Sequence, residues 1–205
     1  TGTVAHGLSA VPKMMIIKGR SFSDAWIVYH KNIGATKDLR LNLTNAASTN
    51  SGPFNNTEPT SSVFSLGTDS AVNGSSSTYL ALCFAPSQFI SIGSYEGNAN
   101  TNGAFVPTLN SLGVPLQPVW AIFKDIDAAY GWGIYDTERN GYNGSNANLM
   151  ADATTVEGTT FQLDIVSGGV KMRHGSGVIN TSNTYVYMAI GTPIIDVDGR
   201  IIAGR

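Results

Sequence analysis

One strand-like motif occurs twice in this sequence, and its repetition constrains the fold more than any other feature. The segments DAWIVYH and YGWGIYD contain Trp26–Tyr29 and Trp132–Tyr135, so both aromatic residues recur after 106 positions. If the same interval holds elsewhere, the chain is built from two copies of one unit.

Other parts of the sequence keep the interval of 106 without any gap. The matched positions are Gly7 with Gly113, Pro12–Lys18 with Pro118–Lys124, Leu43 with Leu149, Val72 with Val178, and Thr78-Tyr79 with Thr184-Tyr185. The connecting segments differ, as expected when buried strands constrain residues and solvated loops do not. We therefore expect two tandem repeats, residues 1–106 and 107–205, packed as one module of a longer polypeptide.

Short apolar or alternating runs, bounded by Gly, Pro, Asn and Ser, predict an all-β protein. The expected strands of the first half are Lys13–Lys18, Ala25–His30, Leu39–Thr44, Ser62–Leu66, Thr78–Ala85 and Phe89–Tyr95. Those of the second half are Val119–Lys124, Gly131–Asp136, Phe161–Val166, Val170–Arg173, Tyr185–Ile190 and Ile194–Val197. Only Thr44–Ala47 and Leu149–Thr154 suggest a helical turn. This pattern favours a β-sandwich resembling a jelly roll.

Repeated aromatic residues supply the expected core. Period-2 alternation places the Trp and the Tyr of each motif on opposite faces of one strand. We expect a buried Trp to organise each repeat, with the other repeated aromatics packed around it. The expected core residues are Trp26, Tyr29, Tyr79, Trp132, Tyr135 and Tyr185.

Composition narrows the classes of partner. Charged residues make up 13% of the 205 residues and the net charge is −2, against a typical charged share of roughly 25%. The surface is therefore polar but weakly charged, which argues against nucleic acid or an anionic membrane as a partner. No apolar run approaches the ~18 residues of a membrane span. The single cysteine, Cys83, excludes an intrachain disulfide and is expected to be a buried hydrophobe.

Catalytic motifs are not evident in this sequence. His6, His30 and His174 show no metal-ligand spacing, and no nucleophile elbow, zinc-protease or phosphate-loop motif occurs. We therefore expect no enzymatic activity and no cofactor, although a glycan-degrading enzyme with two carboxylates stays an alternative. Two aspartate pairs could hold calcium, namely Asp125 with Asp127 and Asp196 with Asp198. The simpler interpretation is that these residues are solvated turn aspartates.

Aromatic and amide side chains in polar segments form the candidate ligand site. Aromatic rings can stack on the apolar face of a sugar, while amides bind its hydroxyls. The alternative is that these rings pack back onto the sandwich. The candidates are Phe54, Asn55, Asn56, Tyr95, Tyr130 and Tyr142.

Several long blocks of the sequence resemble a repeat family found in virion proteins of tailed bacteriophages, chiefly fibre-like or tail-associated products. They include HGLxxxPKM, WxVYHxxxGATK, NNTxPTSSVFSLGT and GSYxGN, written with x where the residue is not part of the pattern. The blocks are His6–Arg20, Trp26–Lys37, Asn55–Thr68, Val72–Ala85, Gly93–Asn98, Pro118–Lys124, Trp132–Arg139 and Tyr185–Ala189. The resemblance implies a virion part in a sandwich similar to concanavalin-like jelly rolls, and it supplies no catalytic residues.

Three functions follow from these expectations. The first is adhesion to the bacterial host through a surface glycan or receptor. The second is a structural spacer or decoration that contacts only other virion subunits, because stacked repeats build length. The third is an enzyme that degrades envelope glycans. The resemblance implies synthesis in the host cytoplasm, a place on the tail or fibre, and a homotrimer for the full-length protein.

Overall fold

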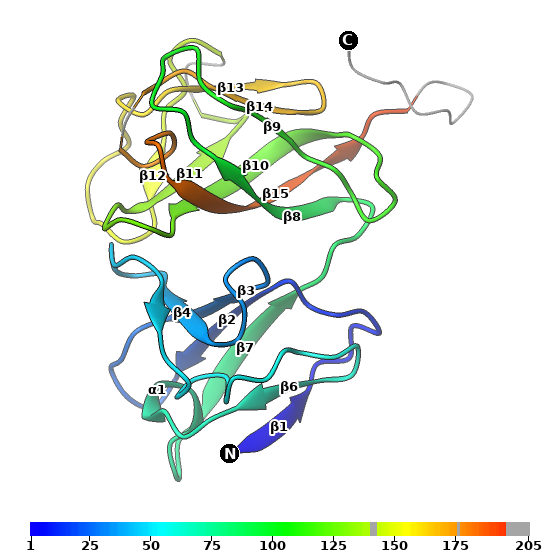
Figure 1. Ribbon diagram of the computed structural model, residues 1–205, viewed down its shortest axis with the longest axis vertical. Helices are drawn as coiled ribbons and strands as arrows, with labels where there is room; N and C mark the ends of the chain where they lie inside the picture. Colours follow the sequence, from blue (N-terminus) through cyan, green and yellow to red (C-terminus); the bar gives the residue numbers. More distant parts are fainter. Residues whose placement is uncertain (140–142, 176, 196–205) are drawn as a thin grey trace. The chain divides into compact units, whose positions relative to one another are not determined.

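The computed structural model describes residues 1–139, 143–175 and 177–195, which form an all-β protein of antiparallel sheets (Figure 1). The chain divides into two compact units, unit 1 (Thr1–Ala85) and unit 2 (Pro86–Arg205). This division differs from the expected repeat boundary after residue 106. The strands Ile90–Glu96 and Phe105–Pro107 both pair inside unit 2, so the division falls between Ala85 and Pro86.

Unit 1 is a two-layered sandwich. Its larger sheet has the strand order β5-β4-β3-β2-β7, and β1 pairs with β6 in a second sheet. The strands are β1 (Gly2–Ala5), β2 (Met14–Gly19), β3 (Ile27–His30), β4 (Lys37–Arg40), β5 (Ser48–Thr49), β6 (Val63–Leu66) and β7 (Tyr79–Phe84). A short helix, α1 (Ser70–Asn73), begins where the Asp69 side chain accepts a hydrogen bond from Ala71 N.

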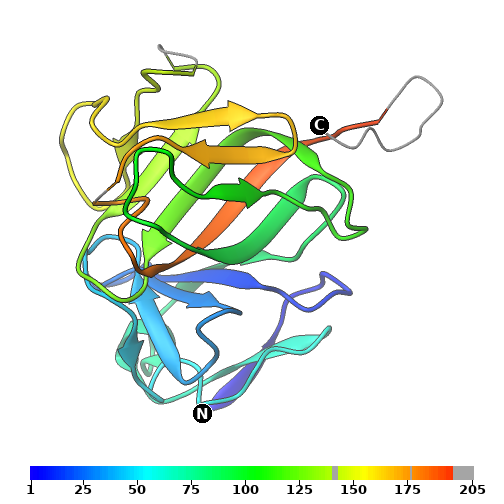
Figure 2. The same ribbon diagram turned by 45° about the horizontal axis from the view of Figure 1, so that its top comes forward.

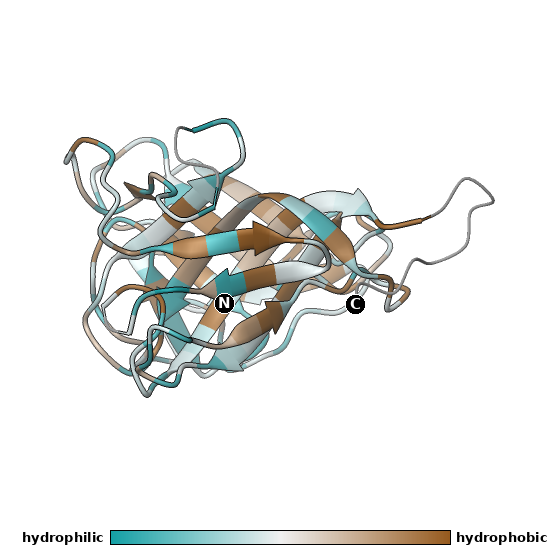
Figure 3. Cartoon of the chain, turned by 90° about the horizontal axis from the view of Figure 1, so that it is seen from above, coloured by the Kyte–Doolittle hydropathy of each residue, from teal (hydrophilic) through white to brown (hydrophobic). Residues whose placement is uncertain are grey.

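The core of unit 1 lies between the two sheets. Met15, Ile17 and Tyr29 project from the larger sheet, and they meet Phe64 and Leu66 of β6. These residues occupy alternate positions of their strands, as one face of a pleated sheet requires. Such alternation of hydrophobic and hydrophilic residues can be followed along several strands (Figure 3).

Unit 2 repeats this plan with more strands. A five-stranded sheet has the order β12-β11-β10-β15-β8, and a three-stranded sheet has the order β13-β14-β9. The three-stranded layer lies over the five-stranded sheet (Figure 2). The strands are β8 (Ile90–Glu96), β9 (Phe105–Pro107), β10 (Leu116–Asp125), β11 (Trp132–Asp136), β12 (Leu149–Met150), β13 (Leu163–Val166), β14 (Gly169–Met172) and β15 (Thr184–Pro193).

The core of unit 2 is rich in aromatic residues. Phe123, Tyr135 and Tyr187 of the larger sheet pack against Val170 and Met172 of the smaller one. Phe123 contacts Tyr135 edge-to-face, with ring centroids 5.9 Å apart. Such pairs contribute about 0.5–1.5 kcal/mol beyond the area that they bury.

The strand registers of the two units agree after a shift of 106 residues. Ile16 pairs with Val28 across β2 and β3, and Ile122 pairs with Ile134 across β10 and β11. Ile16 also pairs with Leu82 of β7, as Ile122 pairs with Met188 of β15. The three-stranded centre of each large sheet therefore has one register. That the chain arose by duplication stays a prediction.

Most expected strands are observed, whereas the helical turns are not. Thr44–Ala47 has no regular structure, and Leu149–Thr154 begins as β12 and continues as a turn. The observed helix, α1, was not expected, and none of the described helices is long and apolar enough to cross a membrane. The expected strand Ile194–Val197 extends into residues that are not described, and β15 ends at Pro193.

The aromatic residues expected in the core divide into two groups. Tyr29, Tyr135 and Tyr185 are fully buried, and Trp132 is 1% exposed. Trp26, however, is only half-buried and lies just before β3 begins. The expectation that a buried indole organises both units was therefore wrong for Trp26.

Tyrosine takes the central place in both cores. Tyr29 and Tyr135 belong to the core clusters of their units, on the face of the strand opposite the Trp. Tyr79 is also only half-buried, at the margin of the unit 1 core.

Candidate functional site

Phe54 lies in the core of unit 1. Its side chain is 1% exposed and contacts Tyr29 edge-to-face, with centroids 5.6 Å apart. The expectation that Phe54 stacks on a ligand was therefore wrong, because its ring is enclosed by its own unit. Asn55 and Asn56 follow it with positive φ angles of 53° and 49° and are exposed, so they form the turn that directs Phe54 inward.

Tyr95 also packs inward, which corrects its expected role as a ligand residue. It lies in β8 and stacks on Tyr185 with ring centroids 5.0 Å apart. Its hydroxyl donates a hydrogen bond to Ile179 O at 2.6 Å. Burial raises the pKa of Tyr95, and the neighbouring Tyr185, Tyr135 and Asp125 raise it further. Tyr95 therefore stabilises unit 2.

Tyr130 is the expected ligand residue whose ring the structure leaves accessible. It is 37% exposed and lies in the loop between β10 and β11. Lys124, which is fully buried at the end of β10, donates hydrogen bonds to Asp125 O at 2.6 Å and to Tyr130 O at 2.7 Å. The Tyr130 backbone is thereby fixed while its ring remains exposed. Tyr142 lies outside the described residues.

Burial changes the acidity of Lys124. Loss of solvation lowers its pKa to about 8, although Asp125 and Asp152 oppose this shift. The ammonium also donates to Ala128 O at 3.5 Å, so it binds three backbone carbonyl oxygens. Lys124 is therefore a structural clamp on the loop that carries Tyr130.

Asp125 and Asp127 serve as hydrogen-bond acceptors in unit 2. One carboxylate oxygen of the buried Asp125 accepts from the amides of Asp127 and Ala128, each at 2.9 Å. The other accepts from Thr181 Oγ1 at 3.1 Å and from Asn183 Nδ2 at 2.9 Å. These bonds fit the interpretation of Asp125 as a turn aspartate.

No group of three metal-ligating side chains occurs within residues 1–139, 143–175 and 177–195. Asp196 and Asp198, the second aspartate pair suggested for calcium, lie outside those ranges. Asp127 accepts a hydrogen bond from Thr184 N at 2.8 Å.

A groove opens at the β7 side of unit 1, and we call it the unit 1 groove. Its volume is about 550 Å³, within the 300–1,000 Å³ typical of ligand pockets. Apolar residues dominate its lining and include Val4, Phe64, Leu66, Ala81 and Cys83.

Polar groups also face this groove. They include the side chains of His6, Asn73, Ser77 and Tyr79. The Tyr79 hydroxyl donates to Ser70 O at 2.6 Å and accepts from Gly74 N at 2.5 Å, so its polar end is used within unit 1. The groove therefore offers both apolar and polar surface.

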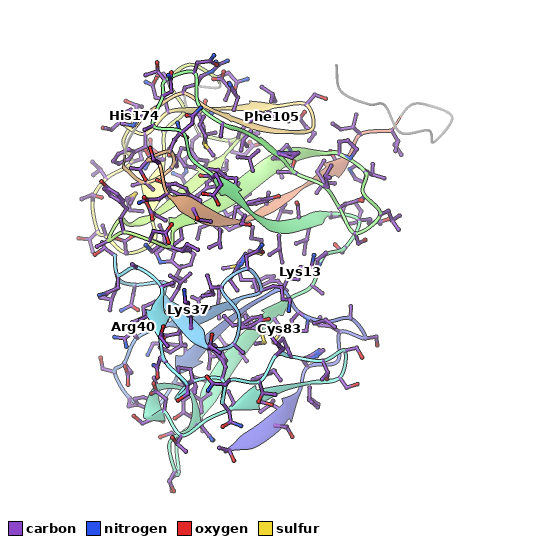
Figure 4. All side chains as sticks on the ribbon, viewed as in Figure 1. Lys13, Lys37, Arg40, Cys83, Phe105 and His174 are labelled. Atoms are coloured by element: carbon purple, nitrogen blue, oxygen red, sulfur yellow. The ribbon has the colours of Figure 1, made fainter. Side chains whose placement is uncertain are left out.

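Cys83 projects from β7 into the unit 1 groove (Figure 4). The side chain is half-buried, and this burial raises the pKa of its thiol above the usual value. The thiol is therefore protonated at neutral pH and behaves as a small apolar group. The Cys83 side chain is less buried than the sequence predicted.

The three histidines occupy separate places. His6 lies at the groove with Nε2 3.1 Å from Thr60 O. His30 is buried in β3 and its Nδ1 accepts from Asn32 N at 3.2 Å. His174 contacts Phe161 edge-to-face in unit 2. Their positions agree with structural roles.

Glu58 links the loop after β3 to the core of unit 1. Its carboxylate accepts from the Tyr29 hydroxyl at 2.5 Å, from Lys31 Nζ at 3.0 Å and from Ala35 N at 2.7 Å. Burial alone would raise the pKa of Glu58, but these hydrogen bonds outweigh it and lower the pKa. Glu58 is thus a structural anion.

Sequence reasoning missed the unit 1 groove because it missed β1, one of its walls. β1 is four residues long and exposed along its length, so it lacks the alternation that marks a half-buried strand.

Together, the fold and the groove define an all-β protein of two sandwich units, one of which has a groove beside β7. The chain belongs to the family described as a domain of unknown function (DUF7483), whose model matches residues 1–192. Searches of curated proteins and of solved structures found no match.

Proposed function

We propose that the chain is a module of a tail- or fibre-associated virion protein of a tailed bacteriophage, and that it attaches the particle to a bacterial surface glycan or receptor. The resemblance of its sequence blocks to such virion proteins motivates this proposal. A weakly charged surface, with a net charge of −2 over 205 residues, is compatible with a neutral ligand such as a glycan. The module acts by binding, without catalysis or a cofactor.

The observation that carries the adhesion proposal is the presentation of Tyr130. The Lys124 ammonium holds the backbone of this loop, and the Tyr130 ring stays exposed. A rigid aromatic ring offers contact area with little loss of conformational entropy on binding. Asn55 and Asn56 are exposed in unit 1 and serve as secondary candidates.

Binding of the labelled chain to a panel of bacterial cells and to a glycan array tests this proposal. Tyr130→Ala should abolish binding, whereas Phe105→Ala should not. Phe105 is the matched control because it is another exposed aromatic residue of unit 2. Equal binding of the wild type and Tyr130→Ala would refute the role of Tyr130, and no binding to any cell or glycan would refute adhesion.

A structural spacer within the virion is the second candidate function. It is favoured by the shared register of the two units, since a repeated unit can extend a fibre. On this proposal the isolated chain binds other virion subunits but neither cells nor glycans. Light scattering on the full-length protein would test the proposed homotrimer.

A further inference from the structure

A second cavity of unit 1 lies beside β4, and we call it the β4 pocket. Its volume is about 130 Å³, well above the roughly 10–15 Å³ that a single water molecule requires. It is therefore large enough to take a small polar group of a ligand. Its described lining consists of Asp38, Leu39, Arg40, Asn45, Ala46 and Ser48, none of which lines the unit 1 groove.

The β4 pocket contains a buried acid, Asp38, whose side chain is 1% exposed. Oδ1 accepts a hydrogen bond from Ser48 Oγ at 3.1 Å, across the pairing of β4 with β5. Oδ2 is closed to bulk solvent and accepts no hydrogen bond from the part of the chain that the structure describes. Buried polar atoms of native proteins nearly always have a hydrogen-bond partner, so the missing donor for Oδ2 needs an explanation.

Arg40 meets the charge of Asp38 but not its need for a hydrogen bond. It lies two residues further along β4 (Figure 4), and its Nε is 3.6 Å from Asp38 Oδ2. This distance is within the range of an ion pair but too long for a hydrogen bond. The other lining residues are neutral, so the charges of the described lining cancel. The pocket therefore lacks a neutral hydrogen-bond donor rather than a cation.

A metal ion does not fit these groups. Calcium takes six to eight oxygen ligands, usually with several carboxylates among them. Asp38 is the only acid in the described lining of the β4 pocket. The guanidinium of Arg40, 3.6 Å from the same carboxylate, would also repel a second cation. The same repulsion disfavours an ammonium group as the ligand.

The remaining groups of the pocket match the edge of a sugar. The Arg40 guanidinium donates hydrogen bonds, and the Asn45 carboxamide both donates and accepts them. Ala46 adds a small apolar wall. Each sugar hydroxyl likewise donates and accepts, while the C–H groups beside it are apolar. Asn45 and Ser48 are exposed, so the pocket can be entered from solvent.

From these observations we propose that the β4 pocket binds two neighbouring hydroxyl groups of a neutral hexose. One hydroxyl donates to Asp38 Oδ2 and accepts from Arg40, and the next bonds to the Asn45 carboxamide. The Arg40 side chain is 41% exposed, and it shifts to admit the first hydroxyl, since exposed side chains change rotamer rapidly. This site lies in unit 1 and does not depend on Tyr130 or on the adhesion proposal.

Nuclear magnetic resonance of the full 205-residue chain tests this proposal. The probes are glucose, galactose, mannose and N-acetylglucosamine, each titrated as the free sugar. At least one should cause saturable shifts of the backbone amide signals of residues 38–48, and the tightest binder is then used for the variants. If none of the four causes such shifts, the pocket holds water only and the proposal is overturned.

Asp38→Leu removes the buried acceptors at similar side-chain volume. It should weaken sugar binding at least ten-fold, as expected for the loss of a hydrogen bond to a charged group. Asp24→Leu is the matched control, because Asp24 is an exposed acid of unit 1 outside the pocket lining. This control should bind the sugar as the wild type does. Equal affinities of the wild type and Asp38→Leu would contradict the role of Asp38.

Ala46→Phe provides a second variant that keeps Asp38 and Arg40. The larger ring should fill the pocket from its apolar wall and abolish the saturable shifts. Amide signals outside residues 38–48 should match those of the wild type in both variants, which shows that the chain is folded. Sugar binding that survives Ala46→Phe would place the ligand elsewhere and overturn the proposal.

Calcium chloride is the probe for the competing occupant. It should leave the signals of residues 38–48 unchanged, whereas saturable shifts with calcium and none with the sugars would identify a cation site and refute the proposal. Tyr130→Ala should retain the hexose at the β4 pocket. Hexose binding by a chain that attaches to no cell would refute adhesion but not this site.

Discussion

Lys18 and Lys124 hold the loops that follow their strands through the same pair of hydrogen bonds. Each ammonium donates to the carbonyl of the next residue, at 2.9 Å for Lys18 and 2.6 Å for Lys124. Each also donates to the carbonyl of the residue four positions after the lysine, which is Phe22 O at 3.4 Å for Lys18 and Ala128 O at 3.5 Å for Lys124. The two lysines are 106 residues apart. The interval of 106 therefore relates equivalent side-chain hydrogen bonds as well as equivalent strand registers.

Replacement of Lys124 by methionine should destabilise the protein by about 2–4 kcal/mol. The change keeps a similar length of side chain but leaves three loop carbonyls without their donor. Lys18→Met should cost less, since Lys18 is only partly buried. Urea unfolding of both variants provides the measurement, and a larger loss for Lys18→Met would contradict the clamp role of Lys124.

Stability should rise with pH above about 8 because of Lys124. Its folded pKa of about 8 lies below the ordinary value of 10.5, so between these values the unfolded state binds more protons. The free energy of unfolding therefore increases with pH, by at most about 1.4 kcal/mol per pH unit. Lys124→Met should lack this increase, and identical slopes between pH 8 and 10 would contradict the burial of a lysine charge.

Tyr135 should contribute more to stability than Trp26. Tyr135→Ala should cost about 3–5 kcal/mol, because it leaves a large cavity among residues such as Phe123. Trp26→Ala should cost about 1–2 kcal/mol, since this indole is half-buried. Chemical denaturation compares them, and a greater loss for Trp26→Ala would restore the indole as the organising residue.

Phe54→Ala and Tyr130→Ala should differ in their effect on stability. Phe54→Ala should cost about 3–5 kcal/mol through loss of its enclosed ring. Tyr130→Ala should change stability by less than about 1 kcal/mol. Thermal unfolding separates the two, and a marked destabilisation by Tyr130→Ala would show that the ring supports the fold.

The sequence was sufficient to predict the centre of each large sheet, because the buried strands of the two halves have similar residues at a constant interval of 106 positions. The run Pro12–Lys18 and its copy Pro118–Lys124 predicted β2 and the end of β10, with the shared lysine. Alternation also placed the Trp and the Tyr on opposite faces. It could not show which face meets the second sheet, so Trp26 was misplaced.

Long-range pairing explains the remaining errors. β8 follows β7 closely in sequence but pairs with β15, almost a hundred residues later, and no local pattern encodes that choice. The boundary between the units was misplaced for this reason. Phe54 and Tyr95 were predicted to be ligand residues because they lie among polar residues. The turn formed by Asn55 and Asn56 directs the ring of Phe54 inward. The alternation of side chains along β8 directs the ring of Tyr95 inward.

Amide hydrogen exchange at single-residue resolution tests most directly whether β7 is an edge strand while its counterpart β15 is paired on both sides. The amides of Tyr185, Tyr187 and Ala189 should be strongly protected by their ladder with β8. Those of Tyr79, Ala81 and Cys83 should exchange at least a hundred times faster, while Leu80 and Leu82 stay protected by β2. Equal protection of the two sets of amides would contradict an open edge in unit 1.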